Sequence, residues 1–256
     1  MMRFASLGSG SEGNGLVVEV GSTRLLLDCG FSIAETVRRL ERLGLQPDML
    51  DAVLVTHEHE DHVGGVSRFA SRYDLPVYLT HGTRTASFNG NGDFADSVLI
   101  DSHDPFSIRD IEIFPYPVPH DAREPTQFVF SDGQSRLGVL TDAGSSTPHI
   151  EEMLSGLDGL VIECNHDPEM LANSAYPERL KARIGGRLGH LGNAQAAQIL
   201  SRIDTQNLQH VIAAHLSQKN NRPELAAAAL SGALNCARDW IGIASQAEGF
   251  DWRMLE

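Results

Sequence analysis

The stretch Thr56-His57-Glu58-His59-Glu60-Asp61-His62 places three imidazoles among carboxylates, directly after the apolar segment 52–55. Because side chains alternate along an extended chain, His57 and His59 point to the same side and can bind one ion. Asp61 and His62 come after the chain turns, so they can bind a second ion beside the first. Neutral imidazole and carboxylate suit zinc, manganese or iron. A solvated, histidine-rich loop is the alternative, but four ligand-type residues at this spacing favour metal binding.

Size and composition indicate a globular protein with a substantial core. The chain has 256 residues, of which 41% are hydrophobic, and we expect a single domain over 1–256. No apolar run approaches the roughly 20 residues needed to cross a bilayer, and the first residues lack the apolar region of a signal peptide. Cys29, Cys164 and Cys236 are far apart, which argues for a reducing compartment and against disulfides. We therefore expect a cytoplasmic protein with no membrane partner.

The charge of the chain bears on its substrates. The net charge is −14, from 34 acidic and 20 basic residues. A protein that binds long duplexes through a broad basic face shows the opposite sign, so the charge argues against tight nonspecific binding of this kind. A phosphodiester substrate is still compatible with the charge, because two divalent ions would set the field in their own pocket.

Apolar runs bounded by Gly, Pro or Asp predict many short strands. The predicted strands are 4–7, 16–20, 24–28, 52–56, 77–80, 98–100, 112–116, 127–131, 136–141, 159–163 and 211–214. The predicted helices are 32–43, 61–72, 147–154, 193–202 and 223–238, the first of which opens with the capping box Ser32-Ile33-Ala34-Glu35. Many strands, followed by mixed strands and helices, predict two sheets face to face with helices on their outer faces.

The spacing His57-x-His59-x-Asp61-His62 resembles the signature of the metallo-β-lactamase superfamily. The resemblance implies an α/β fold, a four-layered αββα sandwich, with metals at one edge and further ligands from strand ends downstream. It also implies two divalent ions, zinc or manganese, with a bridging hydroxide that attacks the substrate. Two such ions lower the pKa of the shared water and neutralise charge in the transition state.

Three downstream residues follow predicted strands where the resemblance requires ligands. His120, in Pro117-Val118-Pro119-His120, would join His57 and His59 on the first ion. Asp142, in Leu140-Thr141-Asp142, would bridge both ions, and His215, in Ala213-Ala214-His215, would join Asp61 and His62 on the second. Aspartate at the bridging position is typical of phosphodiester and thioester hydrolases, whereas lactam-hydrolysing members have cysteine there. Asp28 also follows an apolar strand, and we predict that it orients a ligand histidine.

A second constellation concerns proton transfer. His190, in Gly189-His190-Leu191-Gly192-Asn193, precedes His215 in an arrangement that resembles the C-terminal motifs of RNase Z, the tRNA 3′-processing endonuclease. In that family a glutamate after an earlier strand partners a non-ligand histidine, and Glu163 occupies that place here. We predict that Glu163 orients His190, which protonates the leaving oxygen. Asp61, as a ligand of the second ion, completes the predicted catalytic set. The alternative is that His190 only caps a helix.

Further motifs resemble the YycJ-like (WalJ-like) branch, described as DNA exonucleases or, more cautiously, as metal-dependent hydrolases. They include Ser9-Gly10-Ser11-Glu12-Gly13-Asn14, Pro119-His120-Asp121-Ala122 and Glu163-x-Asn165-His166-Asp167. The resemblance implies that 165–187 forms a lid over the metals. Lys181, Arg183 and Arg187 would then offer cations to a phosphate backbone. A solvated helix face is the alternative for these three residues.

The sequence therefore predicts a dinuclear metal-dependent hydrolase of phosphodiester bonds, and the resemblance favours a nucleic-acid exonuclease. One alternative keeps the fold and changes the substrate to a small cyclic or activated phosphodiester or a thioester, which the acidic surface favours. Another is a regulatory module with structural metals. The complete ligand set and the candidate acid argue against the regulatory module. No prediction follows for the oligomeric state.

Overall fold

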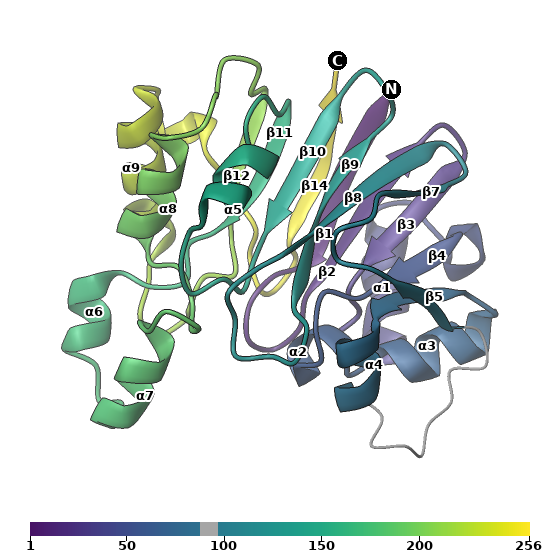
Figure 1. Ribbon diagram of the computed structural model, residues 1–256, viewed down its shortest axis with the longest axis horizontal. Helices are drawn as coiled ribbons and strands as arrows, with labels where there is room; N and C mark the ends of the chain where they lie inside the picture. The colour runs from purple at the N-terminus through teal and green to yellow at the C-terminus, as the bar shows by residue number, and fades with distance from the viewer. Residues whose placement is uncertain (88–96) are drawn as a thin grey trace.

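Two sheets lie face to face in the computed structural model, which describes residues 1–87 and 97–256 (Figure 1). The first sheet contains, in spatial order, β14 (Phe250–Leu255), β1 (Met2–Gly8), β2 (Gly15–Val20), β3 (Thr23–Leu27), β4 (Ala52–Leu54), β5 (Val77–Thr80) and β6 (Ser97–Ile100). The second contains β13 (Gly242–Ile243), β12 (His210–Ala214), β11 (Gly159–Glu163), β10 (Arg136–Leu140), β9 (Thr126–Ser131), β8 (Ile111–Pro117) and β7 (Phe106–Ile108).

Each sheet is antiparallel on one side and parallel on the other. In the first sheet the pairs from β14 to β3 are antiparallel and those from β3 to β6 are parallel. In the second sheet the pairs from β7 to β10 are antiparallel and those from β10 to β13 are parallel. The carboxyl ends of parallel strands meet at one edge of a sheet, and ligands bind outside such edges in open α/β sheets.

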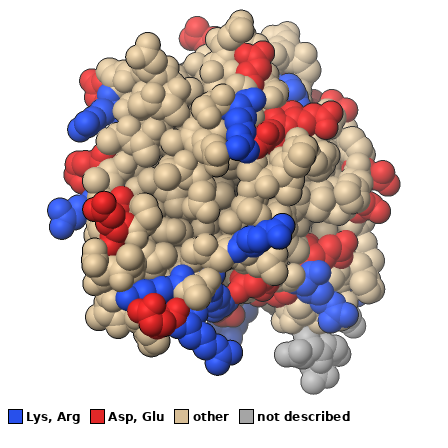
Figure 2. Space-filling view, turned by 60° about the vertical axis from the view of Figure 1, so that its left-hand side comes forward, with Lys and Arg blue, Asp and Glu red and all other residues tan. Residues whose placement is uncertain are grey.

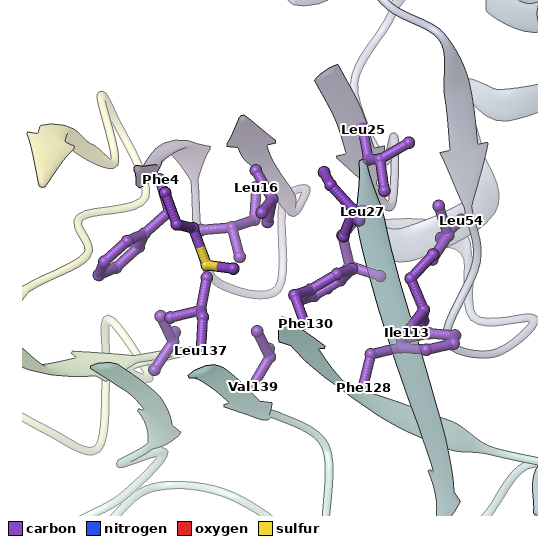
Figure 3. Close-up of a cluster of buried hydrophobic side chains, with 14 of the residues drawn as sticks. Phe4, Leu16, Leu25, Leu27, Leu54, Ile113, Phe128, Phe130, Leu137 and Val139 are labelled. Atoms are coloured by element: carbon purple, nitrogen blue, oxygen red, sulfur yellow. The ribbon is translucent and has the colours of Figure 1, made fainter. Parts of the chain in front are cut away.

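The space between the sheets is filled by apolar side chains from both (Figure 3). Phe4, Leu25 and Leu54 from the first sheet and Phe128 and Phe130 from the second belong to one cluster, and all five are fully buried. Removing a buried phenylalanine side chain of this kind costs about 3–5 kcal/mol, because a cavity is left behind. This core holds the two sheets in register and so fixes the relative positions of their strand ends.

Helices cover the outer faces of both sheets (Figure 1). The helices near the first sheet are α1 (Ile33–Arg42), α2 (Glu60–Val63), α3 (Val66–Tyr73) and α4 (His81–Ser87). The helices against the second sheet are α5 (Pro148–Met153), α8 (Asn193–Leu200) and α9 (Pro223–Leu234). Two more helices, α6 (Pro168–Ala172) and α7 (Glu178–Ile184), stand beside the sandwich, and η1 (Pro47–Met49) and η2 (Arg238–Trp240) are single turns. The predicted four-layered αββα sandwich is confirmed.

Several element boundaries differ from the prediction. The helix predicted over 61–72 is two helices, α2 and α3, separated by Gly64-Gly65. A side chain on Gly65 would place its Cβ 1.9 Å from the Phe31 carbonyl oxygen, so this close approach requires glycine. The helix predicted over 223–238 ends at Leu234, because Asn235 adopts a left-handed backbone at φ 52°.

Some short elements of the structure were not predicted from the sequence. β14 pairs with β1 at the edge of the first sheet, β7 and β13 are edge strands of the second, and α4 was also missed. Such strands bury little of their surface, so their hydrophobic pattern is weak. None of the helices in the part of the chain that the structure describes is long and apolar enough to span a membrane.

Candidate metal centre

The predicted ligands converge at the carboxyl ends of strands from both sheets. His57 and His59 lie in the loop after β4, while Asp61 and His62 lie in α2. The remaining three follow strands of the second sheet, His120 after β8, Asp142 after β10 and His215 after β12. Their ligand atoms form three groups, each within 4.8 Å, which are His57-His59-His120, Asp61-His62-His215 and His57-His62-Asp142. The first two groups contain the same residues as the two predicted sets, and Asp142 lies with one histidine of each.

Four of the five predicted ligand histidines have a hydrogen bond to oxygen at Nδ1. The partners of these Nδ1 atoms are Thr56 Oγ1 for His57 (2.9 Å), Asp28 Oδ2 for His62 (2.7 Å), the Gly189 carbonyl oxygen for His120 (3.0 Å) and Glu163 Oε1 for His215 (3.1 Å). Each Nδ1–H donates to an oxygen, so the lone pair of each Nε2 is left for the centre. Asp28 thus contacts His62, as the prediction that it orients a ligand histidine requires.

The centre contains electron-rich atoms that face one another. His120 Nε2 lies 3.2 Å from His59 Nδ1, and His62 Nε2 lies 3.1 Å from Asp142 Oδ2. Within the described residues, His57 Nε2 and Asp142 Oδ2 are buried without a hydrogen-bond partner. Buried acceptors without donors are costly unless a cation lies among them. The donor set of imidazole and carboxylate therefore fits divalent metal ions.

The pKa shifts in the second group, Asp61-His62-His215, also indicate a site for a cation. Burial lowers the pKa of His215, but Asp142, Asp61 and Glu163 outweigh it and raise that pKa to about 10. Burial raises the pKa of Asp61, but hydrogen bonds from His215 and His62 outweigh it, so the net shift is downward. The carboxylates thus favour positive charge at the position that the imidazoles face.

Three residues of the centre have an uncommon backbone conformation. Asp28, Asp142 and His215 each follow a strand that pairs in parallel and have φ values of 60°, 53° and 52°. The left-handed region is rarely adopted by residues other than glycine and persists where the surrounding structure holds it. The chain therefore turns away from the strand direction at the first residue after β3 and β12, and at the second residue after β10. Aspartate and histidine adopt this region more often than most other residues, but their presence does not by itself identify such a turn.

Glu163 and His190 form a pair beside the predicted ligands. His190 Nδ1 donates to Glu163 Oε1 at 2.8 Å, and Glu163 Oε2 accepts from the backbone N–H groups of Ala143 (3.0 Å) and Leu191 (3.1 Å). Burial lowers the pKa of His190, but the Glu163 carboxylate outweighs it and raises that pKa. Glu163 is fully buried, whereas 22% of the His190 side chain is exposed. The predicted contact between Glu163 and His190 is confirmed.

A cavity of about 330 Å³ opens at the centre, and its wall includes the segment predicted to be a lid. The lining residues include His59, Asp61, Asp142, His190, His215, Ser11, Asp121, Arg183 and Ile184. Arg183 and Ile184 belong to α7, and Arg183 Nε lies 2.6 Å from Asp121 Oδ2. Asp121 follows the predicted ligand His120, so α7 is tied directly to the rim of the centre.

The three predicted cations of the lid have different surroundings. Arg183 lines the cavity, and Arg187 lines an adjoining hollow of about 300 Å³. Lys181 lines neither, because its Nζ contacts the Ala172 carbonyl oxygen (2.8 Å) and Glu178 Oε1 (2.9 Å). Figure 2, which brings the left-hand side of Figure 1 forward, shows Lys and Arg next to Asp and Glu mainly toward the edges of the view. Of the three cations, Arg183 thus lines the cavity, Arg187 lines the adjoining hollow, and Lys181 is bonded within the segment 165–187.

The sequence reading assigned no role to several residues that contact the centre. Thr56 accepts from His57 and donates to Asp28 Oδ2 at 2.9 Å, and Asp121 pairs with Arg183. Asn14 and Ser9 contact the second group from the loop between β1 and β2. All four residues lie in motifs quoted in the sequence analysis, so membership of these motifs could have pointed to them. Their contacts, however, depend on the fold.

Residues 23–215 match the β-lactamase superfamily domain, and the chain belongs to this family of metal-dependent hydrolases. It is 34% identical over 255 residues to exodeoxyribonuclease YycJ of Bacillus anthracis, which covers 99% of this chain and 97% of that protein. It is 34% identical over 228 residues to exodeoxyribonuclease WalJ of Streptococcus pneumoniae, which covers 88% of this chain and 85% of that protein.

The crystal structure of Zn(2+)-bound PqqB from Methylobacterium extorquens shares the fold. Its TM-score is 0.75 at 18% identity, over 99% of this chain and 100% of that one. The predicted superfamily and its YycJ-like branch are confirmed by these comparisons. Together with the groups of histidine and aspartate, they support divalent metal binding by this chain.

Proposed function

We propose that the protein is a two-metal phosphodiesterase that acts on nucleic acid as an exonuclease. The observation that carries the proposal is the Glu163–His190 pair, which lies beside two groups of ligand-type atoms in one cavity. The relatives YycJ and WalJ are named exodeoxyribonucleases, which supports the choice of substrate. The proposal includes a cytoplasmic location, a nucleic-acid partner and one domain over 1–256 in which 165–187 is a lid.

The side chains of the centre would hold two divalent ions, zinc or manganese. His57, His59 and His120 would bind the first ion, and Asp61, His62 and His215 the second, with Asp142 shared between them. Bound ions of this kind make water a nucleophile near neutral pH and neutralise charge on the phosphate. The hydrogen bonds to Nδ1 fix the rings in the orientation that binding requires before any ion arrives.

His190 would deliver the proton that the departing oxygen needs. Its Nδ1 is occupied by Glu163, so Nε2 is the atom available on the cavity side of the ring. Glu163 is fixed by two backbone N–H groups and also contacts His215, so the orientation of the proton donor is coupled to that of a ligand. A positioned imidazole contributes typically about 10²- to 10⁴-fold to such a step.

The lid would contact the phosphates next to the one that is cleaved. Arg183 is the strongest candidate, because it lines the cavity and its side chain is 62% exposed while it pairs with Asp121. A guanidinium binds phosphate through two parallel hydrogen bonds. Arg187 would extend the track along the adjoining hollow. For Lys181, a role in binding phosphate remains a prediction without a supporting contact.

A second candidate function is hydrolysis of a small cyclic or activated phosphodiester, or of a thioester. The net charge of −14 and the cavity volume of about 330 Å³ favour a small substrate. Long strands carry a charge on every phosphate and are repelled by an acidic surface at low salt. Length dependence separates the two candidates, because equal rates on a dinucleotide and a long single strand would favour the small substrate.

The test compares His190→Gln with the wild type on substrates that differ in their leaving group. The substrates are end-labelled single- and double-stranded oligonucleotides and bis-p-nitrophenyl phosphate. Cleavage of an oligonucleotide releases an alkoxide, which needs a proton, whereas the nitrophenyl ester releases a weakly basic phenolate. We expect kcat on oligonucleotides to fall by about 10²- to 10⁴-fold, and kcat on the nitrophenyl ester to fall much less. Metal content should remain that of the wild type.

His210→Gln is the matched control, because His210 Nε2 contacts the Met254 carbonyl oxygen and not the centre. An equal loss on both substrates for His190→Gln would assign the residue a role in shaping the site and not in proton transfer. Unchanged turnover on oligonucleotides would remove His190 from the mechanism. A thioester included in the same panel tests the second candidate directly.

A further inference from the structure

The loop between β1 and β2 lies against the second group of predicted ligands. Asn14 Nδ2 lies 3.2 Å from Asp61 Oδ2, 3.2 Å from the Asp61 carbonyl oxygen and 3.0 Å from His62 Nε2. The Asn14 backbone N–H also donates to the Asp61 carbonyl oxygen at 2.8 Å. Asn14 is 6% exposed, so these contacts are shielded from water. This residue therefore touches both members of the group that come from α2.

The Asn14 amide cannot turn freely, because both of its ends are bound to Gly10. The Gly10 backbone N–H donates to Asn14 Oδ1 at 2.9 Å, and Asn14 Nδ2 donates to the Gly10 carbonyl oxygen at 3.1 Å. The Gly30 backbone N–H donates to the Asn14 carbonyl oxygen at 3.0 Å. The amide nitrogen carries two hydrogens, so one remains for the centre, where Asp61 Oδ2, the Asp61 carbonyl oxygen and His62 Nε2 compete for it.

An ion at His62 Nε2 would end that competition. The Nδ1–H of His62 is committed to Asp28, so Nε2 carries a lone pair that an ion would occupy. The Asp61 carbonyl oxygen already accepts from the Asn14 backbone N–H, so the remaining side-chain hydrogen would then be left to Asp61 Oδ2. With one carboxylate oxygen of Asp61 held by Asn14, the carboxylate keeps one orientation toward the ion. Hydrogen bonds of this kind to a ligating carboxylate order the ligand before binding.

The same loop also holds the third member of the group. The backbone N–H of His215 donates to Ser9 Oγ at 2.9 Å, and the Ser9 N–H donates to the Ser245 carbonyl oxygen at 3.1 Å. His215 has the left-handed φ of 52°, so its backbone needs external support. Ser9 and Asn14 thus contact His215, Asp61 and His62, which make up the second group, from one short loop.

We propose that Asn14, assisted by Ser9, is a positioning residue that sets the affinity of the second metal site and leaves the first unchanged. The inference rests on the proposed function in one respect, that the second group binds its own ion. Removing a hydrogen-bond partner of a metal ligand typically weakens binding about 10- to 100-fold. The first group, His57, His59 and His120, takes its support from Thr56 and Gly189 and not from this loop.

The experiment uses Asn14→Ala with Gln246→Ala as the matched control. Gln246 holds the same loop from outside, because its Oε1 accepts from the Glu12 N–H at 2.8 Å and its Nε2 donates to the Gly13 carbonyl oxygen at 2.8 Å. It therefore supports the loop at positions other than the Asn14 amide. Metal-free protein is titrated with cobalt(II), and the visible absorption of each site is followed in competition with a chelator.

We expect wild type and Gln246→Ala to load two ions with the same pair of affinities. Asn14→Ala should bind the first ion as before and the second about 10- to 100-fold more weakly, with an altered absorption band for that site. Thermal unfolding of the metal-free variants checks that each is folded. Equal weakening in both variants would show that the loop as a whole matters, and equal affinities in wild type and Asn14→Ala would end the proposal.

The outcome also separates this inference from the proposed function. A wild-type protein that binds a single ion would overturn both the two-metal function and the role of Asn14. A wild-type protein that binds two ions and cleaves no phosphodiester would overturn the function alone, while the affinity comparison would still decide the role of Asn14.

Discussion

The two sheets share a pairing pattern but contribute to the centre in different ways. Each sheet changes from antiparallel to parallel pairing at its fourth strand. The first sheet supplies four predicted ligands from one continuous segment after β4, whereas the second supplies single side chains after β8, β10 and β12. A site built from one loop is encoded locally, and a site built from separate strand ends exists only once the sheet has formed.

The largest effect is expected from Asp142, because it lies between the predicted ligands of 57–62 and those that follow separate strands of the second sheet. Asp142→Asn keeps the size of the side chain and removes the charge that faces His62 and His215. We expect kcat on phosphodiesters to fall on the order of 10³-fold or more, because the residue serves both proposed sites. Atomic absorption should show that both ions are held more weakly.

The matched control is Asp132→Asn, in the turn before β10 and so at the opposite end of that strand. It should retain wild-type metal content and activity. Loss of the second ion alone in Asp142→Asn would mean that Asp142 belongs to one site. The two groups of predicted ligands would then be independent of each other, contrary to the proposal that they share Asp142.

The contrast between the two sheets also explains how much the sequence could predict. His57, His59, Asp61 and His62 could be predicted from spacing, because the alternation of an extended segment and the turn after it fix their geometry. His120, Asp142 and His215 could be predicted because each follows an apolar strand and matches the family pattern.

What the sequence could not predict depends on tertiary structure. The contacts of Asn14 with Asp61 join segments 47 positions apart in the chain. The break between α2 and α3 likewise follows from the approach of Phe31, 34 positions before Gly65. Local pattern carries no information about such neighbours.

A smaller effect is expected in α7, where two cations on one helix have different surroundings. Arg183 lines the cavity and pairs with Asp121, while Lys181 is bonded to Ala172 and Glu178. We expect Arg183→Ala to raise KM for oligonucleotides roughly tenfold, which corresponds to the loss of one charge-assisted hydrogen bond. The increase should shrink as salt is raised, since screening already weakens the contact.

Lys181→Ala is the comparison on the same helix, and we expect a smaller rise in KM than for Arg183→Ala, because the Lys181 Nζ is bonded to Ala172 and Glu178. If both variants raise KM equally, α7 contributes only general positive charge and the lid has no specific phosphate contact. If neither does, the segment 165–187 does not bind the substrate through these side chains. Steady-state kinetics on one oligonucleotide at three salt concentrations distinguishes these results.

The smallest effect on activity is expected from a substitution in the first sheet, away from the centre. It tests whether the predicted ligands in 57–62 depend on strand pairing in that sheet. Glu19 on β2 pairs with Arg3 on β1 and Arg24 on β3, each at 2.6 Å. Burial raises the pKa of Glu19, but the hydrogen bonds from Arg3 and Arg24 outweigh it, so the pKa is lowered on folding. The stability that this pairing contributes is therefore full above the unfolded pKa of about 4.3 and is lost as pH falls through the folded value.

We expect Glu19→Gln to lower the free energy of unfolding by about 1–3 kcal/mol at pH 7, with a smaller difference from wild type below about pH 4. Urea unfolding at both pH values measures this, with Glu112→Gln on the exposed face of β8 as the control. Metal content and kcat at pH 7 should match the wild type, because the loop after β4 carries its own ligand geometry. A fall in metal content for Glu19→Gln would show that even the contiguous set depends on the whole sheet.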